Sequence, residues 1–210
     1  MSETTSSSRS DHLRASPPLL PIASLDKLTR VHHLVPVIIY VPIIVALLVL
    51  GLGRVSVLGA IGLFAAGYAM WTLAEYWIHR VVFHFEPEQG WGAKVHFLIH
   101  GVHHEHPNDP LRLVMPPLAS IPLAIAFALL FRWVFGGDMW MPVAAGFLAG
   151  YVVYDEIHYL LHHYVPSNRF GRRLRELHMR HHFQDDTRGF GISAPYWDKV
   201  FRTNVKAKRG

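Results

Sequence analysis

The sequence predicts an all-α integral membrane protein whose four transmembrane helices form two hairpins. Apolar residues make up 51% of the 210 residues, and they gather into four long runs, which is typical of membrane spans rather than of a soluble core. The break inside each pair of runs is only three or four residues long and contains two glycines, as expected for a tight turn between helices. Cysteine is absent, which excludes disulfides and thiolate metal sites.

Each apolar run is long enough to cross a bilayer. A hydrocarbon core of about 30 Å requires about 20 helical residues at 1.5 Å each. We expect spans at about residues 34–52, 55–78, 118–135 and 139–161, with turns at Gly51–Arg54 and Gly136–Asp138. Prolines early in the first span are expected to kink it, which membrane helices tolerate. The chain therefore crosses the membrane and returns twice.

Residues 1–30 differ in composition from the rest of the chain. They are rich in Ser and Pro and carry mixed charge, which predicts a disordered tail that leads into a juxtamembrane stretch. No secretory signal is expected, because a basic region, an apolar run and a small-residue cleavage site do not occur in that order. Residues 31–210 are expected to form a single membrane domain.

Hairpin connectivity places both termini and the central loop, residues 85–117, on one side of the membrane. Of the 20 Lys and Arg residues, four precede the first span, three lie between Arg80 and Arg112, and eleven follow the last span. Only Arg54 and Arg132 lie near the opposite turns. By the positive-inside rule the side with most basic residues is the cytoplasm. The net charge of +5 is then explained by anionic membrane lipid, not by nucleic acid.

Ten of the 16 histidines fall into four short clusters, HRVVFH, HGVHH, HYLLH and HMRHH. Two clusters have the spacing i, i+3, i+4 and one has i, i+4, so a helix places their imidazoles on one face. All four clusters follow spans on the predicted cytoplasmic side. The ten candidate metal ligands are His79, His84, His100, His103, His104, His158, His162, His178, His181 and His182.

This number of imidazoles predicts a dinuclear metal site in a cytoplasmic helical cap. One ion takes about four to six ligands, so ten histidines match two ions with about five each. Imidazole suits iron, zinc, copper and nickel. Two iron ions can use dioxygen to attack an unactivated C–H bond, and the bilayer would supply an apolar substrate. Among the other histidines, His12, His32 and His33 are expected to be interfacial anchors, whereas His96, His106 and His163 stay open as ligands.

The last span carries further polar residues on one helical face. Tyr151, Asp155, His158 and His162 stand at i, i+4, i+7 and i+11. An ionisable residue in an apolar segment indicates a functional site, and Asp155 could fix the tautomer of a ligand imidazole. The alternative is that Asp155 reaches the interface and is solvated. Glu75 has the same i, i+4 relation to His79.

The ordered motifs HRVVFHFEP, HGVHHEHPNDPLRLVMPP, YDEIHYLLHH, HMRHHF and FGISAPYWDKVF resemble the fatty acid hydroxylase superfamily of sterol desaturase-like, integral membrane di-metal oxygenases. The resemblance covers about residues 73–203 and is closest to the fatty acid 2-hydroxylases. It implies that the ten histidines bind two iron ions, with zinc possible in isolated protein. It also implies that Tyr151 and Asp155 lie near the reacting carbon, and that Asp109 and Arg112 shape the loop beneath the metals.

The resemblance implies a non-haem di-iron monooxygenase that hydroxylates an acyl chain, at C2 of a fatty acid or of a ceramide-bound or other lipid-bound acyl group. The reaction uses O2 and external electrons. No cytochrome b5 domain precedes the motifs, so a separate donor protein of cytochrome b5 or ferredoxin type is expected. The polar head of the substrate is expected to meet Arg169, Arg172, Arg173 or Arg175. Two alternatives stay open: the same chemistry on a sterol or carotenoid, and a membrane metal-binding or transport protein.

Overall fold

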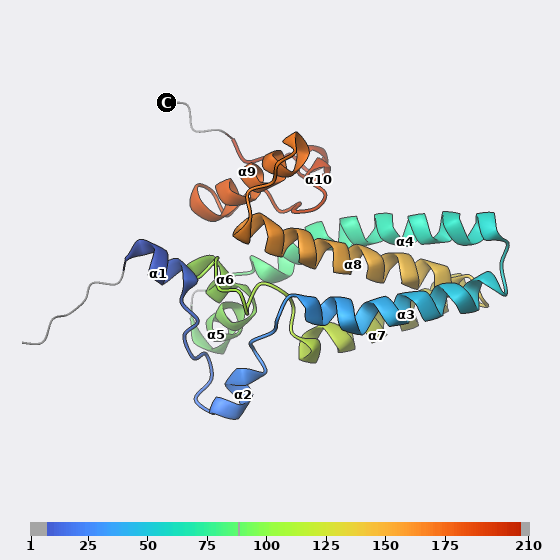
Figure 1. Cartoon of the computed structure of the whole chain (residues 1–210), viewed down its shortest axis with the longest axis horizontal. Helices are drawn as coiled ribbons and strands as arrows, with labels where there is room; N and C mark the ends of the chain where they lie inside the picture. Colours follow the sequence, from blue (N-terminus) through green and yellow to red (C-terminus); the bar gives the residue numbers. More distant parts are fainter. Residues whose placement is uncertain (1–7, 88, 207–210) are drawn as a thin grey trace, which may run out of the picture.

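The computed structural model describes residues 8–87 and 89–206, and this part of the chain is helical with no β-strand. Figure 1 shows the long helices running side by side, with the shorter helices gathered at one end. The long helices are α3 (Leu34–Leu52), α4 (Val57–Trp77), α7 (Pro117–Phe135) and α8 (Trp140–His163). The shorter elements are α1 (Arg9–Arg14), α2 (Ala23–Lys27), η1 (Ile78–Phe83), α5 (Gly90–His96), η2 (Phe97–Gly101), α6 (Val102–Glu105), α9 (Arg169–Phe183) and α10 (Tyr196–Val200).

Within the described part of the chain, three helices are long and apolar enough to cross a membrane: Leu34–Leu52, Val57–Phe83 and Pro117–Phe135. They correspond to the first three predicted spans. The fourth predicted span is α8, which has 24 residues, but its carboxyl-terminal half contains Asp155 and Glu156 and is less apolar. The fourth crossing therefore stays a prediction. The connections between successive long helices are short, as expected from the sequence: residues 53–56 join α3 to α4, so the predicted turn Gly51–Arg54 overlaps the end of α3, and residues 136–139 join α7 to α8.

Helix α8 lies at the centre of the bundle and contacts α3, α4 and α7. Its side chains are the most completely buried of the four long helices, with Val143 and Ala145 fully inaccessible. Two glycines allow this close approach to α4. A Cβ atom on Gly67 would lie 2.0 Å from the Val143 carbonyl oxygen, and one on Gly146 would lie 1.9 Å from that of Phe64. Small residues at such crossings let helix backbones come into direct contact.

Two segments are π-helical among the shorter helices at one end of the bundle, which we call the cap. One of them accounts for the spacing of His79 and His84, which does not fit an α-helix. His79 and His84 are five residues apart, and in η1 the His84 N–H donates to the His79 carbonyl at 3.1 Å. The wider π turn brings residues i and i+5 to the same side, and such turns are frequent at functional sites. The second π-helix, η2, contains His100 and leads into α6.

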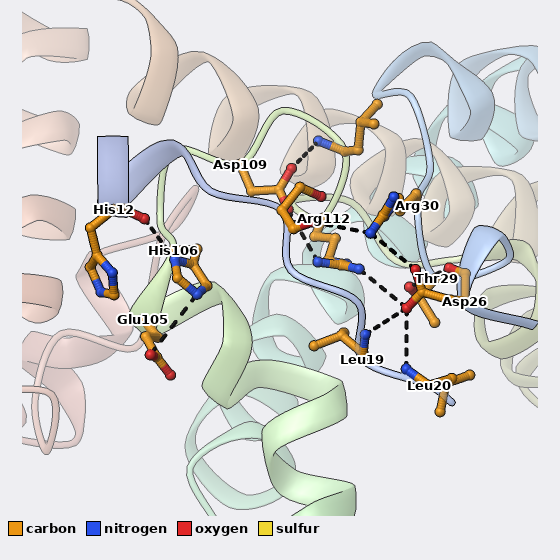
Figure 2. Close-up of polar contacts among 12 residues, drawn as sticks. His12, Leu19, Leu20, Asp26, Thr29, Arg30, Glu105, His106, Asp109 and Arg112 are labelled. Atoms are coloured by element: carbon orange, nitrogen blue, oxygen red, sulfur yellow. Dashed lines mark hydrogen bonds and ion pairs between the residues drawn. The ribbon is translucent and has the colours of Figure 1, made fainter. Parts of the chain in front are cut away.

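Residues 8–30 belong to the segment predicted as a disordered tail that leads into a juxtamembrane stretch, and in the structure they form a strap over the loop between α6 and α7. Residues 1–7 lie outside the described part. At one end of the strap, the Asn108 N–H donates to the Leu13 carbonyl at 2.9 Å. At the other end, the carboxylate of Asp26 lies 3.5 Å from the guanidinium of Arg112 (Figure 2). The loop between α6 and α7 thus supplies hydrogen-bond and ion-pair partners to polar groups of the strap.

Candidate metal centre

The cap brings all ten predicted histidines together in two groups of five. In each group every histidine offers one ring nitrogen, and these nitrogens lie within 4.8 Å of one another. This division matches the expected five ligands for each of two ions. The clusters HGVHH and HMRHH contribute to both groups, whereas each of the other two clusters contributes to one. The first group consists of His79, His84, His100, His104 and His181, and the second of His103, His158, His162, His178 and His182.

The distances between ring nitrogens are those expected around a small cation. Nε2 of His84 lies 3.1 Å from Nε2 of His181, and Nε2 of His104 lies 3.0 Å from Nε2 of His100. In the second group Nε2 of His162 lies 2.7 Å from Nε2 of His178. A metal about 2.1 Å from each nitrogen separates neighbouring ligand atoms by about 3 Å. The spacing therefore fits convergence on one ion in each group.

Backbone carbonyls fix the tautomers of two ligands in the first group. Nδ1 of His79 lies 2.8 Å from the Phe190 carbonyl oxygen, and Nδ1 of His181 lies 2.7 Å from that of Arg188. A carbonyl oxygen can only accept, so each Nδ1 carries the proton and donates it. Nε2 of both rings is then left with its lone pair facing the group. Such outer contacts orient metal-binding imidazoles and raise their basicity.

Buried nitrogens without a partner supply an independent test of fit. Among the described residues, both ring nitrogens of His103, His158 and His182 are buried and make no hydrogen bond, and the same holds for Nε2 of His79. Leaving a buried polar atom unpaired costs about 1–3 kcal/mol. Coordination to a cation would satisfy one nitrogen of each of these rings, and an all-imidazole donor set suits iron or zinc. The residues present therefore fit two metal ions.

Burial keeps the imidazoles neutral, as metal ligands must be. Loss of solvation, with His181 nearby, lowers the pKa of His84 to about 3, and the same causes lower the pKa of His104 to about 2. Burial also holds the pKa of His100, His103 and His178 well below the ordinary histidine value. At neutral pH these rings carry no charge.

The six remaining histidines lie outside both groups. Of the three that the sequence left open as ligands, His96 donates from Nε2 to the Phe83 carbonyl at 2.8 Å, and His106 donates from Nδ1 to the His12 carbonyl at 2.7 Å. His163 packs near Tyr159, with ring centroids 4.4 Å apart. His33 contacts the carboxylate of Glu156 at 3.0 Å. These contacts give the rings structural partners.

Sequence reasoning did not anticipate the role of Glu75. This residue is 2% exposed, and its carboxylate turns away from His79 toward the carboxyl-terminal loop. It accepts from the backbone N–H groups of Ile192 and Ser193, each at 2.8 Å, and from the Ser193 hydroxyl. The same loop presents the Phe190 carbonyl to His79. Through this loop, Glu75 supports the hydrogen bond between the Phe190 carbonyl and His79 of the first group. Because Glu75 and the loop are far apart in the sequence, no local spacing reveals this role.

Asp198 supports the other side of this loop. Its two carboxylate oxygens accept from the N–H groups of Phe190 and Gly191, each at 2.9 Å. The Thr203 hydroxyl also donates to Asp198, at 2.7 Å. Glu75 and Asp198 thus fix both ends of the segment that carries the Phe190 carbonyl. The FGISAPYWDKVF motif contains the loop, but nothing in its composition indicates that a main-chain oxygen is the contact.

Tyr151 and Asp155 are buried inside the bundle below the second group. Asp155 is 1% exposed, so the alternative of a solvated interfacial carboxylate does not hold. The Tyr151 ring packs edge-on against Tyr40 and Trp71, with centroids 5.2 Å away in each case. The Tyr151 hydroxyl and one Asp155 oxygen make no hydrogen bond with the described residues. Tyr151 also lines a small apolar cavity of about 20 Å³ between α4, α7 and α8, together with Ser120.

The loop that follows the HGVHH cluster contains a buried ionic network. Arg112 is 8% exposed and Asp109 is 1% exposed, and their side chains approach to 3.5 Å. Asp109 also accepts from the Leu111 N–H at 3.0 Å. Asp26 joins the network from the strap and binds Arg30 at 3.0 Å (Figure 2). The network fixes the segment that follows the HGVHH cluster.

The fold and the site define a helical protein with membrane-spanning segments and a histidine-rich candidate metal centre at one end. The sequence model of the fatty acid hydroxylase family matches residues 64–203. The chain therefore belongs to the fatty acid hydroxylase family.

Curated relatives and a solved structure agree with this assignment. Dihydroceramide fatty acyl 2-hydroxylase FAH2 of Arabidopsis thaliana is 38% identical over 79% of this chain and 70% of its own length. Ceramide very long chain fatty acid hydroxylase SCS7 of Saccharomyces cerevisiae is 39% identical over 85% of this chain and 47% of its own. Fatty acid 2-hydroxylase of Rattus norvegicus is 39% identical over 69% of this chain and 40% of its own. The solved structure of full-length scs7p, with only its hydroxylase domain visible, has a TM-score of 0.82 at 37% identity, covering 88% of this chain and 71% of that chain.

Proposed function

We propose that this chain is a membrane di-iron monooxygenase that hydroxylates C2 of a fatty acid or of the acyl group of a ceramide or other lipid. The observation that carries the proposal is the division of ten imidazoles into two groups of five on a fold shared with fatty acyl 2-hydroxylases. The reaction replaces a C–H bond with C–OH, and the second oxygen atom of O2 leaves as water. It consumes two electrons and two protons, which an external donor and the solvent supply.

The two histidine groups would each hold one iron ion. When bound, the iron pair supplies the oxidant derived from O2. The protein residues keep the imidazoles neutral by burial and fix ring orientation through the Phe190 and Arg188 carbonyls. Zinc can also occupy these sites in isolated protein, because imidazole sites bind zinc well and the supply of metal decides occupancy.

Tyr151 and Asp155 are the residues that we place near the reacting carbon. Asp155 stands one helical turn from His158 on α8, and Tyr151 stands one turn further along the same face. The apolar cavity beside Tyr151 indicates a route by which an acyl chain reaches this point from between the helices. At its present volume it holds no acyl chain, so α7 and α8 must separate to admit one. We expect an arginine of α9, from Arg169 to Arg175, to meet the polar head.

The proposed topology has four spans, with both termini and the cap in the cytoplasm. Helix α8 is included as a span because it lies among the three candidate spans and matches them in length. The distribution of Lys and Arg supports the cytoplasmic side. Single cysteines placed in a turn and in the central loop test this, since the chain has none of its own. A membrane-impermeant thiol reagent added outside should label Gly137→Cys and not Lys94→Cys; the reverse pattern would contradict the topology.

A separate redox protein of cytochrome b5 or ferredoxin type is proposed as the electron donor. The activity test uses the purified full chain with iron, a donor, O2 and a fatty acid or ceramide. Mass spectrometry should find one added oxygen at C2, and ¹⁸O2 should label it. His103→Ala serves as the inactive control. Product from a sterol or carotenoid, with none from the acyl lipids, would contradict the proposed substrate class and leave the metal chemistry intact.

A further inference from the structure

A groove separates the strap from the first turns of α7 at the end of the bundle nearest the cap. It has a volume of about 600 Å³, within the range of about 300–1,000 Å³ typical of ligand sites. Lys27, Leu28, Arg30 and His32 line it from the strap and the approach to α3, and Leu118 and Ile121 line it from α7. We call this the interfacial groove, because it lies where the apolar helices meet the polar cap.

The polar side of the interfacial groove is basic. Lys27 is exposed, and its side-chain ammonium makes no hydrogen bond or ion pair with any residue that the structure describes. Arg30 is held in place, since its guanidinium lies 3.0 Å from Asp26 and donates to the Ser16 carbonyl at 3.0 Å. No carboxylate of the described residues lines the groove. The start of α7 has no side-chain cap, so the positive end of its dipole adds to the basic character of this edge.

The other side of the groove is apolar and exposed. Leu28 is 55% exposed, Leu118 76% and Ile121 40%. In a membrane these side chains face acyl chains rather than water. A basic edge above an apolar wall matches a molecule with an anionic head and hydrocarbon tails. A neutral lipid would cover the apolar wall but would leave the cation of Lys27 without a partner.

We propose that the interfacial groove binds an anionic phospholipid, with its phosphate on Lys27 and Arg30 and an acyl chain against Leu118 and Ile121. This site is distinct from the proposed substrate position, because the cavity beside Tyr151 is lined by other residues of α7. The lipid joins the strap to α7 and so holds the strap in place. The proposal rests on the groove alone and is independent of the proposed reaction.

The bound lipid is connected to the loop beneath the histidines through charged contacts. Arg30 binds Asp26, and Asp26 approaches Arg112 at 3.5 Å (Figure 2). Because Arg112 follows the second histidine cluster in the chain, a lipid that fixes Arg30 also limits movement of that loop. The expected consequence is that an anionic phospholipid raises the unfolding temperature of the full chain more than a zwitterionic one with the same acyl chains.

Native mass spectrometry of the purified full chain tests the proposal, with phosphatidylglycerol and phosphatidylcholine of identical acyl chains as probes. Wild type should retain phosphatidylglycerol preferentially. Lys27→Gln should weaken that retention about fivefold, since one basic residue near an anionic lipid contributes ~1 kcal/mol. The matched control is Lys199→Gln, which removes the same charge from an exposed lysine outside the groove. Leu118→Gln should weaken retention of both lipids and keep the preference between them.

Three results would overturn the proposal. One is equal retention of the two lipids by wild type, and another is a loss in Lys27→Gln no larger than that in Lys199→Gln. The third is complete displacement of phosphatidylglycerol by an equimolar free fatty acid, which would make the groove a substrate entrance. All three substituted side chains are exposed, so the variants should melt with wild type in lipid-free detergent.

Discussion

Replacing Glu75 by Gln should loosen the first histidine group without touching any ligand. The carboxylate accepts three hydrogen bonds from the carboxyl-terminal loop, two of them backbone bonds of 2.8 Å. At a pH where the Glu75 carboxyl is ionised, a hydrogen bond to this charged acceptor contributes about 1.5–3 kcal/mol, and one to a neutral acceptor contributes about 0.5–1.5 kcal/mol. Gln keeps one carbonyl oxygen for the two backbone donors, so each bond weakens by about 1 kcal/mol. Its NH2 group replaces the acceptor of the Ser193 hydroxyl, which brings the expected destabilisation of the loop to about 2–3 kcal/mol.

The effect on metal binding follows from the position of this loop. It presents the Phe190 carbonyl to Nδ1 of His79, and loss of such an outer contact typically lowers metal affinity about 10- to 100-fold. Glu75→Gln should therefore release the ion of the first group to a chelator while the second ion stays bound. Elemental analysis after graded chelation, together with thermal unfolding, measures both effects. Glu176→Gln is the matched control, since that exposed glutamate contacts only Arg173 and Arg180 among the described residues. Unchanged metal retention and melting in Glu75→Gln would refute the reasoning.

Four further measurements address the ligands, the buried polar face and the effect of pH. Metal analysis of loaded wild type should give close to two ions per chain. His104→Ala should lose the ion of the first group, and His103→Ala should lose the ion of the second group. Loss of both ions in either variant would contradict two separable sites. Asp155→Asn should keep the fold and the metals, but it should lower the amount of product formed per bound metal pair about 10- to 100-fold. If this variant forms as much product per metal pair as wild type, Asp155 has no part in the mechanism. Tyr151→Phe should fall between wild type and Asp155→Asn if its hydroxyl contacts the substrate, and full activity would leave it a packing role. Burial lowers the folded-state pKa of His84 from 6.5 to about 3. As the pH falls, the unfolded chain therefore binds a proton at this ring before the folded chain does, and metal-free protein should lose stability between pH 6.5 and pH 3. A melting temperature that is flat or rises over this range would show that the ring is solvated.

The candidate metal-binding residues could be predicted from the sequence because their chemistry and spacing are local. Helical repeats of i, i+3 and i+4 place imidazoles on one face whatever the rest of the fold does. A cysteine-free, apolar chain with ten clustered histidines is compatible with few functions besides metal binding. The three apolar helices were predictable for the same reason, since length and composition alone decide whether a helix can cross a bilayer. Helix α8 was harder to assign, because its burial among the other helices allows polar residues that an isolated span would exclude.

The path that residues 8–30 take over the loop between α6 and α7 could not be predicted from their polar composition. Composition measures how much apolar surface a segment can bury, but it does not measure the partners that a folded neighbour offers. Here the Leu13 carbonyl and the Asp26 carboxylate find donors on the loop between α6 and α7. Those donors exist only once that loop has taken its shape. The path of the strap is therefore set by its contacts with the rest of the protein.

Local sequence was enough to identify the histidines that converge on the candidate metal centre, but their division into two groups and the contacts that support them depend on tertiary packing. His103 and His104 are neighbours in the chain but belong to different groups, because successive residues on an α-helix point about 100° apart and α6 lies between the two sites. Glu75 and Phe190 act on the same ligand from positions 115 residues apart. Periodicity reports the direction of a side chain from its own helix. What that side chain meets depends on which other segments the packed chain brings to the same place.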